Sequence, residues 1–130
     1  MGEAIRNARG LMGVPVTVKA NTDIGTAMKF TGAAAREVDV AAAGDIVVGT
    51  LYSKPRYFPG DGTIITKYSE ERVALFEGTA VPGNLVMMGT PGTGDVQRYT
   101  IFTPGTDSPE LCAGICIEGA TDAEGKILTN

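Results

Sequence analysis

The sequence of 130 residues contains no histidine and no tryptophan, and it has only two cysteines. Without histidine, neither a Ser-His or Cys-His catalytic pair nor the common kinds of zinc site can be built. A zinc site made of cysteine alone needs four thiolates, and two are present. We therefore predict no catalytic residue, no metal and no cofactor, and a structural or binding protein is favoured over an enzyme.

Basic residues are also scarce, because 11 lysines and arginines stand against 15 acidic residues and give a net charge of −4. A general nucleic-acid binder carries a basic stripe, so no nucleic-acid partner is expected. No apolar run approaches the roughly 20 residues that span a bilayer. No apolar core of a secretory signal follows the first residues. We expect no membrane partner and a protein that is made in the cytoplasm.

The two cysteines, Cys112 and Cys116, stand four positions apart in an apolar run. On one strand they would share a face but lie about 13 Å apart along it. A disulfide needs Cα atoms within roughly 7 Å, so a bridge within this strand is excluded. The spacing predicts two buried, unbridged thiols.

What the sequence does contain is a turn-and-strand phrase that occurs twice. One copy reads Ala43-Gly44-Asp45-Ile46-Val47-Val48-Gly49, and the other reads Pro82-Gly83-Asn84-Leu85-Val86-Met87-Met88-Gly89. Gly-Asp and Gly-Asn pairs favour turns because both residues tolerate a positive φ. The apolar run after each turn does not alternate, which is typical of a strand covered on both faces.

Short strand patterns separated by Gly, Pro, Asp and Asn fill most of the chain. Val14, Val16 and Val18 alternate with polar or turn residues, for example, and no amphipathic window of ten or more residues is present. Such spacing predicts an all-β fold, a small single-domain β-sandwich or β-barrel. The expected strands are 14–18, 27–30, 37–40, 46–52, 64–68, 73–76, 85–88, 96–102, 111–117 and 126–128. The least alternating of them, 46–52, 85–88 and 111–117, are expected at the core.

Residues 1–13 differ from the rest and are predicted to form a short N-terminal arm, with residues 14–130 as the β domain. Residues 3–9 have the pattern of about two helical turns, and glycines 10 and 13 follow. So short a helix is marginal alone, so the arm is expected to order only against a partner. Its apolar residues beside cations suit a surface that is partly apolar and partly acidic. These arm residues are Ile5, Leu11 and Met12 with Arg6 and Arg9.

Three loop motifs allow more than one interpretation. Residues 54–62 hold the one basic-aromatic cluster, Lys54, Arg56, Tyr57 and Phe58, which suits a protein interface, stacking on a single strand, or inward packing of the aromatics. Asp61, between two glycines, is read as a turn residue rather than a calcium ligand. Residues 92–95 begin like a dinucleotide fingerprint, but the third glycine is missing and a strand follows, so a hairpin turn is favoured.

The two turn phrases, together with a late apolar strand, carry a resemblance. The segments are Ala41–Gly49, Thr79–Val86, and Leu111–Ile117 with its ending Gly114–Ala120. They resemble bacteriophage capsid cement proteins, also called head decoration proteins, over roughly residues 26–128. The resemblance implies a small, all-β, non-enzymatic protein that attaches to the outside of an assembled phage head, often as trimers at local threefold axes, and stabilises it.

On this resemblance the expected partners are the major capsid protein and two further copies of the chain, and the expected location is the exterior of the virion. The residues expected to contact the capsid or a neighbouring subunit are Ile5, Arg6, Arg9, Leu11, Met12, Arg56, Tyr57 and Phe58. Two other interpretations stay open: another virion part such as a tail module, and a small β-barrel that binds a ligand or acts as an enzyme.

Overall fold

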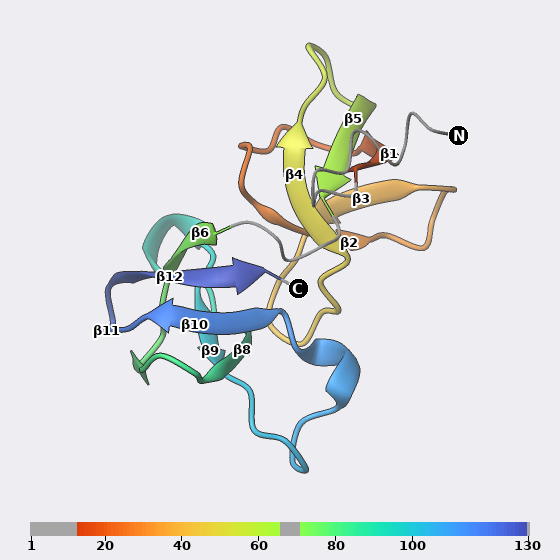
Figure 1. The fold of residues 1–130 in the computed structure, drawn as a ribbon. Helices are drawn as coiled ribbons and strands as arrows, with labels where there is room; N and C mark the ends of the chain where they lie inside the picture. Colours follow the sequence, from red (N-terminus) through yellow and green to blue (C-terminus); the bar gives the residue numbers. More distant parts are fainter. Residues whose placement is uncertain (1–12, 66–70, 130) are drawn as a thin grey trace, which may run out of the picture.

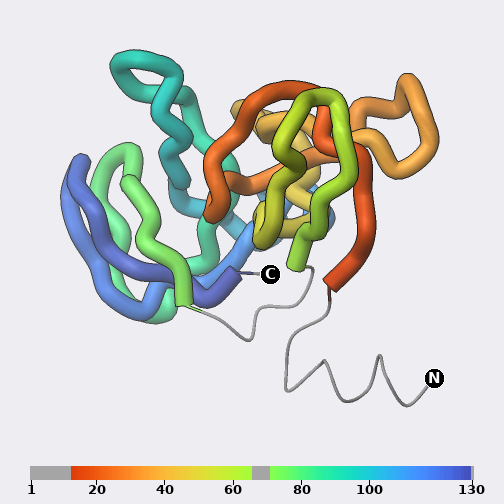
Figure 2. The backbone as a smooth tube through the Cα atoms, turned by 90° about the horizontal axis from the view of Figure 1, so that it is seen from above, coloured from red at the N-terminus to blue at the C-terminus, as the bar shows by residue number. Residues whose placement is uncertain are grey.

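The computed structural model describes residues 13–65 and 71–129, and it confirms the all-β prediction. The strands form two systems that follow one another along the chain (Figure 1). Residues 13–65 form a closed five-stranded barrel, and residues 71–129 form a curled five-stranded sheet with a small two-stranded addition. Figure 2 shows the two systems side by side from above. The predicted β domain thus contains two strand systems within one small fold.

The barrel has the strand order β1-β3-β2-β4-β5, with β5 returning to β1. Its strands are β1 (Gly13–Val18), β2 (Ala27–Phe30), β3 (Glu37–Val40), β4 (Gly49–Ser53) and β5 (Gly60–Ile65). The predicted alternation in β1 is confirmed, because Val16 and Val18 are buried in the barrel core and Val14 packs against it. β1 pairs with β3 only through Thr17 and Val18, which leaves Pro15 outside that ladder.

The predicted turn at Gly60-Asp61-Gly62 is wrong, because these residues belong to β5 and pair with β1. Glycine is needed here for space and not for turning. A Cβ on Gly60 would collide with the carbonyl oxygen of Tyr57, and one on Gly62 would lie 2.6 Å from the carbonyl oxygen of Ser53. The two glycines therefore let β5 pass close to the chain that leaves β4.

The second sheet has the order β6-β12-β10-β8-β9. Its strands are β6 (Glu71–Leu75), β8 (Leu85–Met88), β9 (Tyr99–Ile101), β10 (Gly114–Glu118) and β12 (Glu124–Thr129), and β7 (Thr79–Ala80) pairs with β11 (Ala120–Thr121). The sheet curls until its two edges touch, where Phe76 and Tyr99 form a single parallel bridge. On its other side β6 pairs with β12.

The predicted strand 85–88 is confirmed with the same bounds, whereas the predicted strand 111–117 starts too early. Residues Pro109–Leu111 form a 3-10 helix, and β10 begins only at Gly114. Cys112 therefore lies outside the strand that holds Cys116, so the two thiols do not share a strand face. Ile115 is half-buried, and the core side of β10 is formed by Gly114 and Cys116.

Each strand system has its own hydrophobic core, and β2 lies between them. Met28 points into the barrel core with Val18, Leu51 and Ile64. Its neighbour Ala27 belongs to the second core, which also contains Phe76 and other residues of the second sheet. Because successive strand residues point to opposite faces, one short strand serves both cores. This shared wall joins the barrel to the second sheet.

The apolar run at 46–48 is not a strand, although the sequence predicts one over 46–52. β4 begins at Gly49. Val47 packs against the second core, Val48 packs against the barrel core, and Ile46 is exposed. The run is apolar without alternation because it crosses from one core to the other, and not because a sheet covers both of its faces.

The repeated turn phrase is a true structural repeat. Gly44 and Gly83 have φ values of 82° and 95°, in the left-handed region that favours glycine. The next residue closes each turn with its side chain: Ala42 N–H donates to Asp45 Oδ2 at 2.8 Å, and Val81 N–H donates to Asn84 Oδ1 at 2.9 Å. The two copies therefore share a turn and diverge after it.

Candidate interaction site

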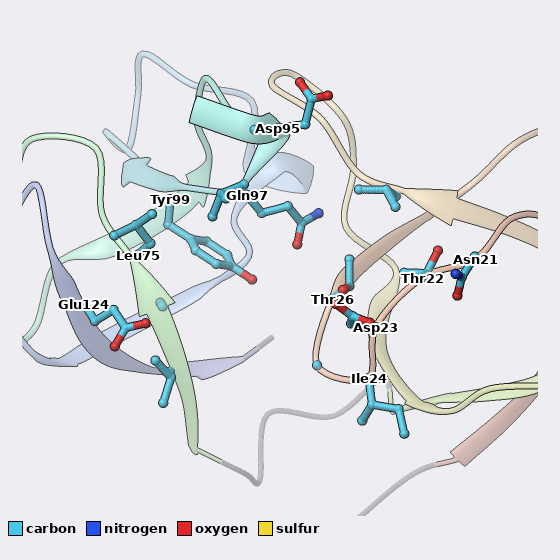
Figure 3. Close-up of a pocket in the computed structure, with 16 residues that line it drawn as sticks. Asn21, Thr22, Asp23, Ile24, Thr26, Leu75, Asp95, Gln97, Tyr99 and Glu124 are labelled. Atoms are coloured by element: carbon cyan, nitrogen blue, oxygen red, sulfur yellow. The ribbon is translucent and has the colours of Figure 1, made fainter. Parts of the chain in front are cut away.

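A cleft lies between the barrel and the β6 side of the second sheet (Figure 3). Its volume is about 760 Å³. It opens where the two edges of the second sheet diverge from the Phe76–Tyr99 bridge. The lining residues come from loop 21–26 and Val40 of the barrel, and from residues 73–75, 94–97, Tyr99 and Glu124 of the second sheet.

Loop 21–26 forms the barrel wall of the cleft, and hydrogen bonds fix its path. Thr22 is buried, and its hydroxyl donates to the carbonyl of Ala20 at 2.8 Å. Gly25, with φ of 97°, donates its N–H to the carbonyl of Leu51 at 2.8 Å. Between these anchors Ile24 is 57% exposed. The loop therefore holds an apolar side chain out of the barrel core.

The opposite wall is the connection from β8 to β9. Gly92 N–H donates to the carbonyl of Val96 at 2.8 Å, and Asp95 N–H donates to the carbonyl of Gly92 at 3.1 Å. Thr93–Asp95 form a 3-10 helix within this connection, which joins antiparallel strands, as expected of a hairpin. It leaves Val96 48% exposed.

Gln97 continues this wall and fastens it to the barrel. Its Oε1 accepts from Ala27 N–H at 3.0 Å. Its Nε2 donates to the carbonyls of Ala27 at 2.9 Å and Ala41 at 2.8 Å. A side-chain amide offers one acceptor and two donors at one position, and all three functions are used here. The cleft is therefore closed at the level of Gln97.

β6 and Tyr99 form the remaining surface of the cleft. β6 is an end strand of its sheet and pairs with β12 on one side. Ala74 is buried, while Val73 is 64% exposed. The Tyr99 side chain projects from the second sheet toward loop 21–26 (Figure 3). Burial raises the pKa of Tyr99 to about 12, and the charge of nearby Arg72 opposes this shift.

The cleft combines exposed apolar side chains with acidic ones. Of the nine large hydrophobic side chains that are exposed in residues 13–65 and 71–129, four line it: Ile24, Val40, Val73 and Val96. Among the described residues, the charged ones that line the cleft are Asp23, Asp95 and Glu124, and the charge of Arg72 lies near Tyr99. Clustered exposed apolar side chains with a polar rim mark interaction sites. This surface suits a partner with apolar and cationic groups.

The predicted contact residues Arg56, Tyr57 and Phe58 lie at the tip of the β4–β5 hairpin, and they do not act alike. Tyr57 is 78% exposed and Arg56 is exposed as well. Phe58 instead packs against the barrel core, which is the inward packing considered for this loop. Figure 1 shows this hairpin extending away from the second sheet. The other predicted contact residues, Ile5, Arg6, Arg9, Leu11 and Met12, lie outside the described residues.

The structure also places the residues that bear on chemistry. Cys112 and Cys116 are both unbridged, and burial raises the pKa of the Cys116 thiol. Within residues 13–65 and 71–129, no three His, Cys, Asp or Glu side chains form a group that could hold a metal ion. The same part of the chain has no helix long and apolar enough to cross a membrane.

Sequence reasoning did not find the cleft. Val96 and Gln97 belong to the predicted strand 96–102, whereas β9 covers only Tyr99–Ile101. No local pattern separates an aliphatic residue that stays exposed from one that enters the core.

Comparison with models of protein families and with curated protein sequences finds no match for this chain.

Proposed function

We propose that this protein is a non-enzymatic virion component that binds the outer surface of an assembled bacteriophage head and stabilises it. The observation that supports this most directly is that one small body carries exposed apolar or aromatic side chains at two separate places. One is the cleft with Ile24, Val73 and Val96, and the other is the hairpin tip with Tyr57. A protein that holds neighbouring subunits together needs at least two contact surfaces.

The body between these surfaces is suited to transmit force. The barrel is closed, so it has no edge strand that could separate or shift its register. The shared strand β2 and the three hydrogen bonds of Gln97 fasten it to the second sheet. Many copies on one head would multiply weak contacts into strong attachment. The proposed partners are the major capsid protein and two further copies of the chain.

Co-sedimentation with purified heads tests the proposal. Full-length protein should bind heads of the phage that encodes it, and cryo-EM of those heads should show added density outside the capsid. The variant Arg56→Ala/Tyr57→Ala should bind roughly tenfold more weakly if the tip contributes more than about 1.4 kcal/mol. The control Lys19→Ala/Phe30→Ala removes an exposed cation and an exposed aromatic elsewhere on the barrel. Full-length protein that does not bind heads would overturn the proposal.

A second test concerns the arm. Deleting residues 2–12 should leave the β domain folded and weaken head binding, with a smaller loss at high salt because exposed arginine contacts are screened. Equal occupancy for full-length and truncated protein at low and high salt would remove the arm from head binding.

The cleft also keeps a ligand-binding function open, because its volume lies in the range of about 300–1,000 Å³ that is usual for small-molecule sites. Binding to tails rather than heads would instead favour a tail module. Sedimentation of the protein with separated heads and tails, and a thermal-shift screen with small ligands, distinguish these functions.

A further inference from the structure

We infer that the tip of the β4–β5 hairpin docks into the cleft of a second copy of this chain, with Tyr57 against the apolar walls and Arg56 against the carboxylates. The contact joins two surfaces that the structure describes. It goes beyond the proposed function, because it requires neither a head nor a particular number of copies. Tip and cleft are different surfaces, so the contact is heterologous.

The hairpin tip carries an aromatic anchor and a cation that its own chain leaves uncovered. Tyr57 is 78% exposed, which is the highest value among the exposed large hydrophobic side chains of residues 13–65 and 71–129. Arg56 is exposed, and it forms no ion pair within the same residues. Tyrosine and arginine are among the residue types that dominate binding energy at protein interfaces.

The tip holds these two side chains in position before any partner binds. Phe58 packs against the barrel core. Pro55 and the carbonyl oxygen of Tyr57 lie so close to Gly60 that a Cβ there would collide with both. A preorganised contact loses less conformational freedom on docking. Because the hairpin extends away from the second sheet (Figure 1), its fixed tip is presented to another molecule and not to its own cleft.

The cleft offers apolar walls for the ring of Tyr57. Ile24 stands exposed on the barrel side, and Val73 and Val96 stand exposed on the side of the second sheet. The volume of about 760 Å³ is in the range of sites that enclose drug-sized molecules. A tyrosine ring and a neighbouring guanidinium can therefore enter the cleft together.

The charges of the cleft complement the cation of the tip. Asp95 and Glu124, both on the side of the second sheet in Figure 3, form no ion pair among the described residues. The third carboxylate of the cleft lies 3.9 Å from Lys54. The charge of Arg72 lies near Tyr99, so three carboxylates stand against one nearby cation. The guanidinium of a docked tip would form charge-assisted hydrogen bonds with the unpaired carboxylates.

Charge exchange between tip and cleft provides the test. The full-length protein should associate with rising concentration in sedimentation equilibrium at low salt, and high salt should weaken the association. Arg56→Glu should weaken it by roughly tenfold or more, and so should Asp95→Asn/Glu124→Lys. Asparagine is chosen at position 95 because it tolerates the φ of 61° found there. A mixture of the two variants should associate again, because each tip then meets a cleft of opposite charge.

The matched control is Lys19→Glu/Glu110→Lys. It reverses one cation and one carboxylate at exposed positions outside the tip and the cleft, so it should associate as the unaltered chain does. Tyr57→Ala should weaken association at low and high salt alike, because it removes the apolar part of the contact. Circular dichroism melts verify that every variant is folded. Heads are left out, because a loss of head binding would not distinguish a tip that contacts the capsid from one that contacts another copy.

Three results would overturn the inference: a full-length chain that stays monomeric at about 1 mM, an Arg56→Glu variant that associates like the control, or a mixture that associates no better than its two components. The proposed function fails separately. Association restored by charge exchange while heads remain unbound would support the tip-to-cleft contact and overturn head binding. Head binding by a chain that stays monomeric would do the reverse.

Discussion

The side-chain amide of Gln97 pairs with the backbone of Ala27 in the way that a neighbouring β-strand would. Oε1 accepts from Ala27 N–H at 3.0 Å, and Nε2 donates to the Ala27 carbonyl at 2.9 Å. The second Nε2 proton goes to the carbonyl of Ala41 at 2.8 Å. One side chain thus satisfies backbone groups on two segments of the barrel, and it does so from the second sheet.

Replacing Gln97 should therefore destabilise the whole fold. Gln97→Ala removes the side-chain partner of Ala27 N–H and of the Ala41 carbonyl, while the Ala27 carbonyl still accepts from Ala41 N–H at 3.0 Å. We expect a loss of about 2–3 kcal/mol in the free energy of unfolding. Gln97→Glu should cost more at pH 7, because a carboxylate would face two carbonyl oxygens with no donor. Urea titration measures both variants. Thr93→Ala, an exposed change in the same loop, is the control and should be neutral.

The two repeated turns should respond alike to substitution of their glycines. Nothing lies within 4 Å of a Cβ built on Gly44 or Gly83, so the cost of a side chain there is conformational rather than steric. We expect Gly44→Ala and Gly83→Ala each to lower stability by about 1–2 kcal/mol. Gly44→Asn should cost less than Gly44→Ala, since asparagine tolerates the left-handed region better. Equal melting temperatures for Gly44→Ala and the unaltered protein would contradict this account.

Stability should fall in alkaline solution because of Tyr99. Its pKa rises from 10.0 to about 12 on folding. A group with a raised folded-state pKa contributes its full stability below pH 10 and loses it as the pH rises to 12. For this shift the loss is about 1.4 kcal/mol at pH 11. Tyr99→Phe should remove most of this loss between pH 9 and 11, as measured by urea midpoints.

Cys116 should also contribute to the loss of stability in alkaline solution. Burial also raises its pKa, from 9.0, so it adds a decline of the same sign that begins near pH 9. The variant Tyr99→Phe/Cys116→Ala should give the flattest pH profile. If Tyr99→Phe declines as steeply as the unaltered protein, the Tyr99 hydroxyl does not carry the effect.

The core position of β12 should be far more sensitive to charge than the neighbouring strand position of β10. Ile127 is fully buried, so Ile127→Asp would bury an unpaired carboxylate and should abolish cooperative folding. Ile115 is half-buried, so Ile115→Asp should fold with a lowered melting temperature. Circular dichroism melts distinguish the two. A cooperative Ile127→Asp transition near that of the unaltered protein would contradict the core assignment.

The elements that the sequence predicts well are those whose residues alternate between one core and solvent. Val16 and Val18 in β1 follow this rule, and the strand Leu85–Met88 has the predicted bounds. The strand prediction fails where neighbouring residues pack into two different cores. Val47 and Val48 read as one buried strand because both are apolar, yet each packs into a different core. A one-dimensional pattern does not record how many cores a protein has.

The residues of the candidate site were also only partly predictable from the sequence. The sequence marks Tyr57 as a contact residue, and its high exposure is compatible with that role. For the adjacent Phe58 it leaves inward packing as one of several interpretations, and the structure shows that Phe58 packs against the barrel core. It does not reveal Gln97, whose importance depends on a separation of 70 positions from Ala27. Long-range contacts between the two strand systems make the site, and local propensity contains no information about them.

The order of the two strand systems along the chain has a consequence for synthesis. Every ladder pairing among the described residues joins two positions within 13–65 or two within 71–129. On a ribosome, all five barrel strands would thus emerge before any strand of the second sheet. Such segments generally fold as units from the N-terminus. We expect the barrel to form first, with Ala27 and Ala41 exposed on its outer face. Gln97 would then be synthesised later and form its hydrogen bonds to these two residues.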